Sequence, residues 1–258
     1  MGSDRIKILA ITQARIGSTR FPEKILKEIS GETILEIHLK RILRSRLITK
    51  LKVATTTEPD AEKIVFICKR LGIEAYRGSV NNVLERFYET AYPEKPDWVV
   101  RLTSDCPLID ADEIDKVIEK AISSDLDYVS NVLRPTFPDG LDTEVFKFAV
   151  LARAMNEAHH ASELEHVTSY IWKNSTYNGG SFFRSDCIVS EIDYSGFRLT
   201  VDTFEDFQVI KKLVQLIGSE RPWLEYIKAL QKYPEIREVN QHLKRNEGYE
   251  KSLLKDNT

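Results

Sequence analysis

A loop that follows the first apolar run of the sequence concentrates positive charge. The stretch QARIGSTRFPEKIL, residues 13–26, follows the apolar run at residues 6–11 and gathers three cations and two small residues: Arg15, Arg20, Lys24, Gly17 and Ser18. Arginine donates forked hydrogen bonds to a phosphate, and lysine adds a compact charge. At about 4 Å and an effective dielectric near 20, each such contact gains roughly 4 kcal/mol before desolvation. The small residues let backbone amides approach an anion. We interpret the stretch as a candidate phosphate-binding loop, with a solvated basic turn as the alternative.

Two aspartates follow other extended runs and have the chemistry of magnesium ligands. Asp105 comes after DWVVRL, and Asp202 comes after FRLTV. If both runs are strands of one parallel sheet, both carboxylates reach the same edge. Mg²⁺ prefers oxygen ligands and often takes one or two carboxylates plus substrate phosphates. The sequence therefore predicts a magnesium site at this pair. As alternatives, Asp202 has the spacing of a helix cap with Glu205, and Asp105 fixes a turn before Cys106.

Three residues of the middle segment have the spacing of a metal site. His159, Glu163 and His166 lie at i, i+4 and i+7, so zinc has to be considered. The pattern breaks around residues 161–162, which favours two helices and polar residues at a cleft, a subunit contact or a solvated face. Cys106 has no histidine partner implied by its spacing, which argues against a nucleophile.

The elements that position these residues alternate between strand and helix. Strands are expected over residues 6–11, 51–57, 73–78, 97–102, 126–131 and 197–201, and helices over 33–47, 57–71, 81–92 and 111–123. This alternation predicts an α/β fold with a mostly parallel central sheet and helices on both faces. In such sheets ligands bind beyond the carboxyl ends of the strands. We expect a single domain over residues 1–245, an excursion from the sheet at about 134–190, and a mobile polar tail at 246–258.

Composition excludes several classes of protein. The chain has 258 residues, of which 42% are hydrophobic and 30% charged, with a net charge of −3. A general nucleic-acid binder carries a basic excess, so no nucleic-acid partner is expected. No run has the apolar length that spans a bilayer, and the charged N-terminus does not resemble a signal peptide. The three cysteines, Cys68, Cys106 and Cys187, fit neither a disulfide framework nor a zinc motif, which favours the reducing cytoplasm.

The opening motif Arg15-x-Gly17-Ser18-x-Arg20-x-Pro22-x-Lys24 resembles that of the cytidylyltransferases that make CMP-activated sugars. These include the acylneuraminate and 3-deoxy-manno-octulosonate enzymes, and the branch named for spore coat polysaccharide biosynthesis protein F is the most similar. Further matching motifs are VATTT, RGSVNNVLERF, RLTSDCPLID, PDGLDTEVF, ELEHVTSYI and RLTVDTFEDF. They occur in the expected order from residue 6 to about residue 210.

This resemblance implies a Rossmann-like nucleotidyltransferase fold, a homodimer, and transfer of CMP from CTP to an acidic sugar with release of pyrophosphate. The catalytic residues that it implies are Arg15, Lys24, Asp105 and Asp202, the last two as ligands of Mg²⁺. The nucleotide-binding residues would be Ala14, Arg15, Gly17, Ser18, Arg20, Lys24, Thr55, Asn82, Arg86 and Ser104. The acceptor-binding residues would be Arg101, Asp139, Gly140, Asp142, Glu144 and His166.

Departures from the family pattern leave two other functions open. Glu23 stands where the branch commonly has glycine, and it places a carboxylate beside the phosphate loop. This residue is the best support for a nucleotide-binding regulator without catalysis, whereas the presence of both aspartates and all three loop cations argues against one. Arg101 and Arg134 suit a carboxylate or a phosphonate equally, so a phosphate- or phosphonate-bearing acceptor is the second alternative.

Overall fold

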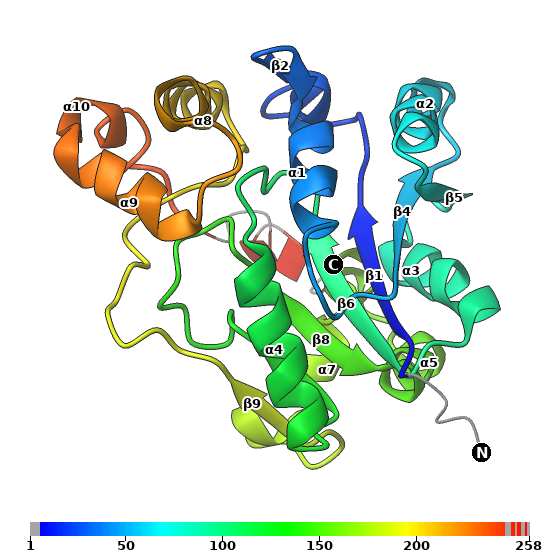
Figure 1. Cartoon of the computed structure of the whole chain (residues 1–258). Coiled ribbons are helices and arrows are strands. Elements are labelled where there is room, and N and C mark those ends of the chain that lie inside the picture. The colour runs from blue at the N-terminus through cyan, green and yellow to red at the C-terminus, as the bar shows by residue number, and fades with distance from the viewer. Residues whose placement is uncertain (1–5, 246–248, 251, 254–255, 257–258) are drawn as a thin grey trace.

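A seven-stranded sheet forms the centre of the molecule (Figure 1). The computed structural model describes residues 6–245, 249–250, 252–253 and 256. In spatial order the strands are β5 (Glu74–Gly78), β4 (Lys50–Thr56), β1 (Ile8–Gln13), β6 (Trp98–Thr103), β8 (Glu144–Lys147), β7 (Tyr128–Ser130) and β9 (Ser185–Cys187). Strand β8 runs antiparallel to both of its neighbours, and the other adjacent pairs are parallel. The predicted mostly parallel sheet is confirmed.

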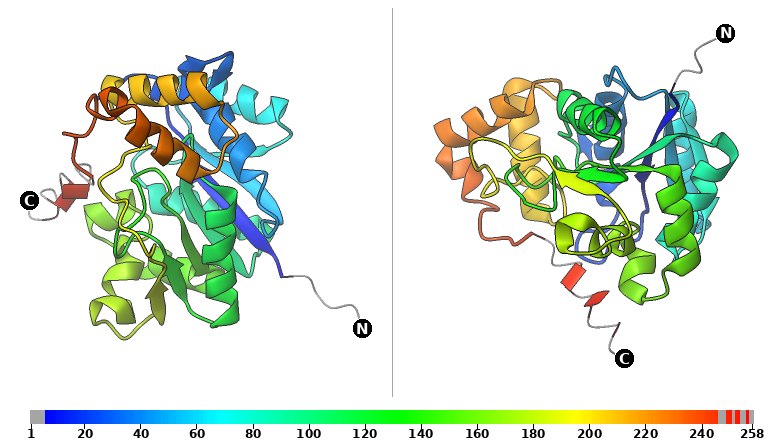
Figure 2. Two further views of the ribbon diagram at one scale, coloured as in Figure 1. Left: turned by 60° about the vertical axis from the view of Figure 1, so that its left-hand side comes forward. Right: turned by 90° about the horizontal axis from the view of Figure 1, so that it is seen from below.

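Helices cover both faces of this sheet (Figures 1 and 2). Side chains of β1 alternate between two cores: Ile8 and Ala10 face one, and Leu9 and Ile11 face the other. The first core is closed by α1 (Ile34–Ile42), α2 (Glu62–Arg70) and α4 (Ala111–Ser123). The second is closed by α3 (Val83–Ala91), α5 (Phe148–Glu157) and α7 (Ser169–Lys173). Helix α6 (Ala161–Glu165) lies between α5 and α7 in the chain.

Caps set the starts of several helices. Thr33 accepts a hydrogen bond from the Glu36 amide, and Glu36 returns the contact as a capping box for α1. The Asp110 carboxylate caps α4, which has the predicted bounds. Helix α1 ends at Ile42, earlier than predicted, and the chain then turns so that the Ser45 hydroxyl contacts Asp115.

The middle segment returns to the sheet twice within residues 134–190. Strand β8 inserts between β6 and β7, and β9 pairs with β7 at the edge. The expected strand at 197–201 is not part of the sheet. Instead, Leu199 donates a backbone hydrogen bond to Asp139, and the Asp139 amide donates to Phe197. This extended segment is therefore held by the loop around Asp139.

The last helices form a third packed layer beside α1. They are α8 (Phe204–Ile217), α9 (Trp223–Lys232) and α10 (Pro234–Arg237), and they share a core with Ile34, Leu108 and Leu141. Short turns and ribbons complete the fold: η1 (Lys24–Leu26), η2 (Pro59–Ala61), η3 (Tyr92–Glu94), η4 (Thr176–Asn178), β2 (Glu28–Ile29) and β3 (Glu32–Thr33). Within the described ranges, none of the helices has the length and apolar character that crossing a bilayer requires.

Candidate active site

The carboxyl ends of β1 and β6 open onto a cavity of about 260 Å³. The loop after β1 and the turn after β6 both contribute lining residues. Of the predicted residues, the cavity is lined by Ala14, Arg15, Ser18, Arg20, Lys24, Arg86, Ser104, Asp105, His166 and Asp202. Residues that the sequence did not single out also line it: Gln13, Thr19, Ile25, Val83, Thr103 and Glu165. The predicted phosphate loop and the predicted acidic pair therefore face the same space.

Lys24 joins the two acidic residues. Its Nζ atom donates to Oδ2 of Asp105 and to Oδ1 of Asp202, each at 2.8 Å. The Arg20 guanidinium also reaches Oδ1 of Asp202, at 2.9 Å. Burial acts to lower the pKa of Lys24, but the two carboxylates raise it overall. Burial acts to raise the pKa of Asp105, but the Lys24 ammonium lowers it to about 2. Both carboxylates thus converge on one cation.

Asp202 reaches this position by a route that differs from the predicted one. It does not follow a strand of the sheet. The Val201 amide donates to the backbone carbonyl of Asp105 at 2.8 Å, and the Thr200 hydroxyl donates to the same carbonyl at 3.1 Å. These two bonds bring the backbones of both acidic residues together. The predicted pairing is present, but the physical reason for it is local backbone hydrogen bonding.

Arg198 anchors the far side of Asp202 and was not predicted. Its guanidinium donates to Oδ2 of Asp202 at 2.9 Å and to both oxygens of Asp206 at 2.8 and 3.1 Å. It also pairs with Asp139 at 2.5 Å. Asp206 additionally accepts from the Asp202 amide. Residues 198–203 are not helical, so the spacing of Arg198, Asp202 and Asp206 carries no signal in the sequence for this support.

Two further arginines supply positive charge to the cavity. Arg15 is exposed and forms no ion pair within the described part of the chain. Arg86 is only 2% exposed, and its Nε atom has no hydrogen-bond partner among the described residues. Burial, followed by repulsion from Arg15, lowers the pKa of Arg86 to about 10. A buried guanidinium without a carboxylate partner is suited to receive an anion.

Three predicted nucleotide residues do not line the cavity. Gly17 lies in the loop with open space around its Cα atom. Thr55 is fully buried in β4, and its hydroxyl has no partner among the described residues. Asn82 caps α3, because its side chain accepts from the Glu85 amide at 2.9 Å. Their assignment to nucleotide binding stays a prediction.

A buried histidine supports the turn that carries Asp105. His38 of α1 is 0% exposed, and its Nδ1 atom donates to the Cys106 carbonyl at 2.8 Å. This donation leaves Nε2 as the acceptor for the Thr12 hydroxyl, also at 2.8 Å. Burial lowers the pKa of His38 to about 4. Sequence reasoning missed this residue because it lies within the apolar stripe of a helix.

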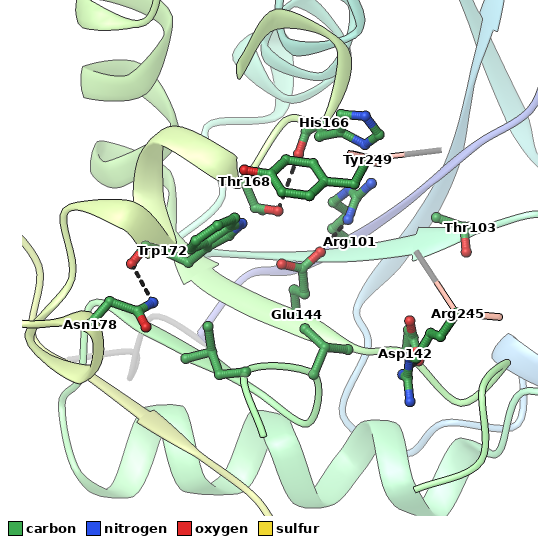
Figure 3. A pocket seen from close by; sticks show the side chains of 12 residues that line it. Arg101, Thr103, Asp142, Glu144, His166, Thr168, Trp172, Asn178, Arg245 and Tyr249 are labelled. Carbon is green, nitrogen blue, oxygen red and sulfur yellow. Dashed lines mark hydrogen bonds and ion pairs between the residues drawn. The ribbon is translucent and has the colours of Figure 1, made fainter. Parts of the chain in front are cut away.

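A second cavity of about 380 Å³ adjoins the first and shares Thr103 and His166 with it (Figure 3). Four predicted acceptor residues line it: Arg101, Asp142, Glu144 and His166. Arg101 and Glu144 are direct cross-strand partners on β6 and β8 and form an ion pair. The Tyr128 hydroxyl donates to the other oxygen of Glu144 at 2.7 Å. Figure 3 shows the Arg101 and Glu144 side chains pointing toward one another.

Residues near the C-terminus contribute one wall of the second cavity. Tyr249 packs edge-on against His166 and Trp172, with ring centroids at 5.1 and 5.7 Å. The Ser252 hydroxyl lies 2.9 Å from His166 Nε2 and donates to Glu165 at 2.9 Å. These contacts fall in the predicted mobile tail, of which residues 246–248, 251, 254–255 and 257–258 lie outside the described residues. The sequence carries no periodic signal for this wall.

Arg245 and the Asp139 loop complete this region. Arg245 lines the second cavity and pairs with Asp142. Asp139 and Gly140 do not line it: Asp139 is bonded to Arg198, and Gly140 packs against the backbone of Leu199. Burial, followed by repulsion from Asp142, raises the pKa of Asp139 to about 7. The Asp139 loop thus contacts Arg198, which supports Asp202 in the first cavity, and through Leu141 it packs into the core shared with α8, α9 and α10.

The histidine-rich stretch of the middle segment is divided between two short helices. Helix α5 ends at Glu157 and α6 starts at Ala161, so the three residues do not share a continuous helical face. Glu163 accepts hydrogen bonds from the amides of His159 and His160. Across the described ranges no group of three or more His, Cys, Asp or Glu side chains suits a metal ion. The zinc interpretation therefore has no support.

Glu23, the departure beside the phosphate loop, points away from the cavity. Its backbone has φ 54°, in the left-handed region that favours glycine. Its carboxylate pairs with Lys63 of α2 at 2.6 Å, and this hydrogen bond lowers the pKa of Glu23. The carboxylate is therefore engaged outside the phosphate loop, which removes the main argument for a regulator that does not catalyse.

Comparison with known proteins identifies the family of this chain. A family model described as cytidylyltransferase matches residues 9–251. The chain is 32% identical over 222 residues to the spore coat polysaccharide biosynthesis protein SpsF of Bacillus subtilis, covering 83% of this chain and 89% of that protein. A solved cytidylyltransferase of Leptospira borgpetersenii matches with a TM-score of 0.85 at 31% identity, over 93% of this chain and 100% of that one.

The fold extends to a more distant structure. A CMP:2-keto-3-deoxy-manno-octonic acid synthetase complexed with CTP matches with a TM-score of 0.62 over 81% of this chain and 98% of that one, at 16% identity. At this identity the likeness concerns the Rossmann-like nucleotidyltransferase fold alone. Because the family model spans nearly the whole chain and the SpsF relative matches over 89% of its length, this chain belongs to the cytidylyltransferase family.

Proposed function

We propose that the protein transfers CMP from CTP to an acidic sugar, a 2-keto acid sugar such as a nonulosonate, and releases pyrophosphate. One observation carries this proposal: a cavity lined by the phosphate loop and an acidic pair adjoins a second cavity lined by charged and aromatic side chains. The first would hold the nucleotide and the second the acceptor. The names of the SpsF relative and of the CMP-sugar synthetase support surface glycan synthesis as the context.

The acceptor cavity has features that suit a sugar acid. Arg101 and Arg245 supply cations for a carboxylate, although each is paired with an acidic neighbour in this structure. Glu144 offers carboxylate oxygens to sugar hydroxyls. Trp172 and Tyr249 supply aromatic surface for the apolar face of a sugar ring. An acceptor that bears a phosphate or phosphonate would use the same arginines and stays the alternative.

The reaction follows from the placement of these groups. An acceptor hydroxyl oxygen attacks the α-phosphorus of CTP, the bond from that phosphorus to the bridging oxygen breaks, and pyrophosphate leaves. Arg15 and Arg20 would stabilise the charge on the pyrophosphate. Positioning by the cavity walls supplies the remainder of the rate enhancement. The proton of the hydroxyl passes to solvent, since no side chain is assigned as general base.

Mg²⁺ fits the acidic pair. Carboxylate oxygens of Asp105 and Asp202 already share one cation, the Lys24 ammonium, so their geometry accommodates positive charge at a common point. Oxygen ligands of this kind are those that Mg²⁺ prefers. When bound, the metal would neutralise charge on the phosphates.

Pyrophosphate release tests the proposal. The protein is incubated with each nucleoside triphosphate, Mg²⁺ and a panel of 2-keto acid sugars, sugar phosphates and phosphonates. Release with CTP and an acid sugar is expected, and it should fall at least about 100-fold in Asp202→Asn. Asp112→Asn, which removes a carboxylate that is 76% exposed, is the matched control and should retain activity. Release with phosphonates alone, or with another nucleotide, would overturn the assignment.

Two further predictions accompany this function. A homodimer is expected from the family resemblance, and light scattering after size exclusion would measure it. The cytoplasm is the expected compartment, and the three free cysteines, Cys68, Cys106 and Cys187, are consistent with a reducing environment.

A further inference from the structure

The point on which Asp105 and Asp202 converge already holds a cation in this structure. We propose that the Lys24 ammonium occupies the metal position in the nucleotide-free protein and moves to the phosphates when a magnesium–nucleotide complex binds. The inference rests on the proposed function, because it concerns the same cavity. It assigns to Lys24 two alternative positions and predicts that metal enters with the nucleotide.

Mutual exclusion follows from the distances. The Lys24 Nζ atom lies 2.8 Å from an oxygen of each carboxylate. A magnesium ion that used these two oxygens would lie about 2.1 Å from each of them. An ammonium and a magnesium ion that share two ligands at these distances would overlap and repel one another. One of them has to leave before the other binds.

The Asp202 carboxylate and the Asp105 backbone have independent supports that remain when Lys24 moves. Arg198 holds Oδ2 of Asp202, the oxygen that Lys24 does not contact. The Asp105 carbonyl is held by the Val201 amide and the Thr200 hydroxyl. Lysine has a flexible four-carbon stem, and Lys24 lines the same cavity as Arg15. The exchange therefore requires a change of side-chain conformation at Lys24, and the Arg20 guanidinium, which also contacts Oδ1 of Asp202 at 2.9 Å, has to move from that oxygen as well.

The number of protein ligands explains why the nucleotide is needed. The described residues offer no cluster of three or more His, Cys, Asp or Glu side chains at this place. A divalent ion bound by these two carboxylates alone would have to displace the Lys24 ammonium, which would then have no new anionic partner. A triphosphate supplies both further oxygen ligands for the metal and a new anionic partner for the lysine.

Binding of Mn²⁺ in the absence of nucleotide tests the exchange. Wild type, Lys24→Met, Lys24→Gln and Lys27→Met are each titrated with Mn²⁺. Electron paramagnetic resonance measures the free Mn²⁺ and so gives the dissociation constant of each protein. We expect both Lys24 variants to bind Mn²⁺ at least tenfold more tightly than wild type, since the competing ammonium is gone. Lys27→Met removes a nearby charge that lies over Phe21, away from the carboxylates, and should change affinity less than twofold. Asp105→Asn added to Lys24→Met should abolish the gain.

Equal Mn²⁺ affinity of wild type and folded Lys24 variants would overturn the inference. Thermal unfolding checks the fold of each variant. If neither Lys24 variant folds, wild type decides alone: micromolar binding of Mn²⁺ without nucleotide refutes the exchange, and binding that requires CTP supports it. Pyrophosphate release by wild type is measured separately. If no acceptor gives pyrophosphate release, the proposed function is rejected. The Mn²⁺ affinities of wild type and the Lys24 variants still decide whether Lys24 and the metal compete.

Discussion

His38 gives the stability of the protein a predictable dependence on pH. The imidazole is fully buried in α1, and burial lowers its pKa from 6.5 to about 4. Because the folded state disfavours the proton, the stabilisation is complete above pH 6.5 and is lost as the pH falls towards 4. At about 1.4 kcal/mol per pKa unit, the full effect is about 3 kcal/mol. Between pH 7.5 and pH 5 the expected loss is about 2 kcal/mol.

Urea unfolding of wild type and His38→Asn at pH 7.5 and pH 5 measures this contribution. Asparagine retains a donor towards the Cys106 carbonyl but does not titrate. The comparison cancels other groups that titrate in both proteins, such as Asp139. We expect wild type to lose about 2 kcal/mol more than the variant on acidification. If both proteins lose the same free energy, His38 is not held neutral and the reasoning fails.

Further predictions concern the loops and walls of the two cavities. Gly140→Ala places a Cβ atom 2.6 Å from the Leu199 carbonyl carbon at φ +110°, so it should lower the free energy of unfolding by about 2–5 kcal/mol and the melting temperature by roughly 4–20 °C. Gly17→Ala, with open space around it, should leave thermal unfolding within about 2 °C of wild type. Arg245→Ala removes a cation that lines the acceptor cavity, so the acceptor KM should rise about tenfold while the KM for CTP stays constant; an equal rise with Lys244→Ala would contradict this. Glu23→Gln breaks only an exposed pair with Lys63 and should leave the KM for CTP within about twofold in steady-state assays.

Much of the sheet was predictable because buried parallel strands are nearly continuous apolar runs. Strands β1, β4 and β6 and helix α4 lie close to their predicted ranges. Strands β8 and β9 escaped prediction because they are short, and β9, with the sequence SDC, carries no apolar pattern. Their place in the sheet depends on pairing with distant segments, which periodicity does not report.

The candidate site shows the same division between local and distant signals. Lys24 and Asp105 were predictable because each follows a strong apolar strand. Asp202 was placed correctly, but through a strand that the sheet does not contain. Arg198 and Tyr249 contact residues that are far away in the sequence, Asp139 and His166 respectively. Residue type alone does not distinguish such a structural side chain from a solvated one.

The two cavities draw most of their walls from different parts of the chain. The proposed nucleotide cavity is built largely from residues before 106, and the proposed acceptor cavity largely from residues after 131, with Thr103 and His166 common to both. Asp202 and its partner Arg198 lie in the later half, although Asp202 lines the first cavity. Under the proposed function, variation in the later half that spares these two residues redirects which molecule is activated and keeps the groups around the first cavity. Grafting the later half of one homologue onto the earlier half of another, with Asp202 and Arg198 unchanged, is a rational route to new nucleotide-activated products.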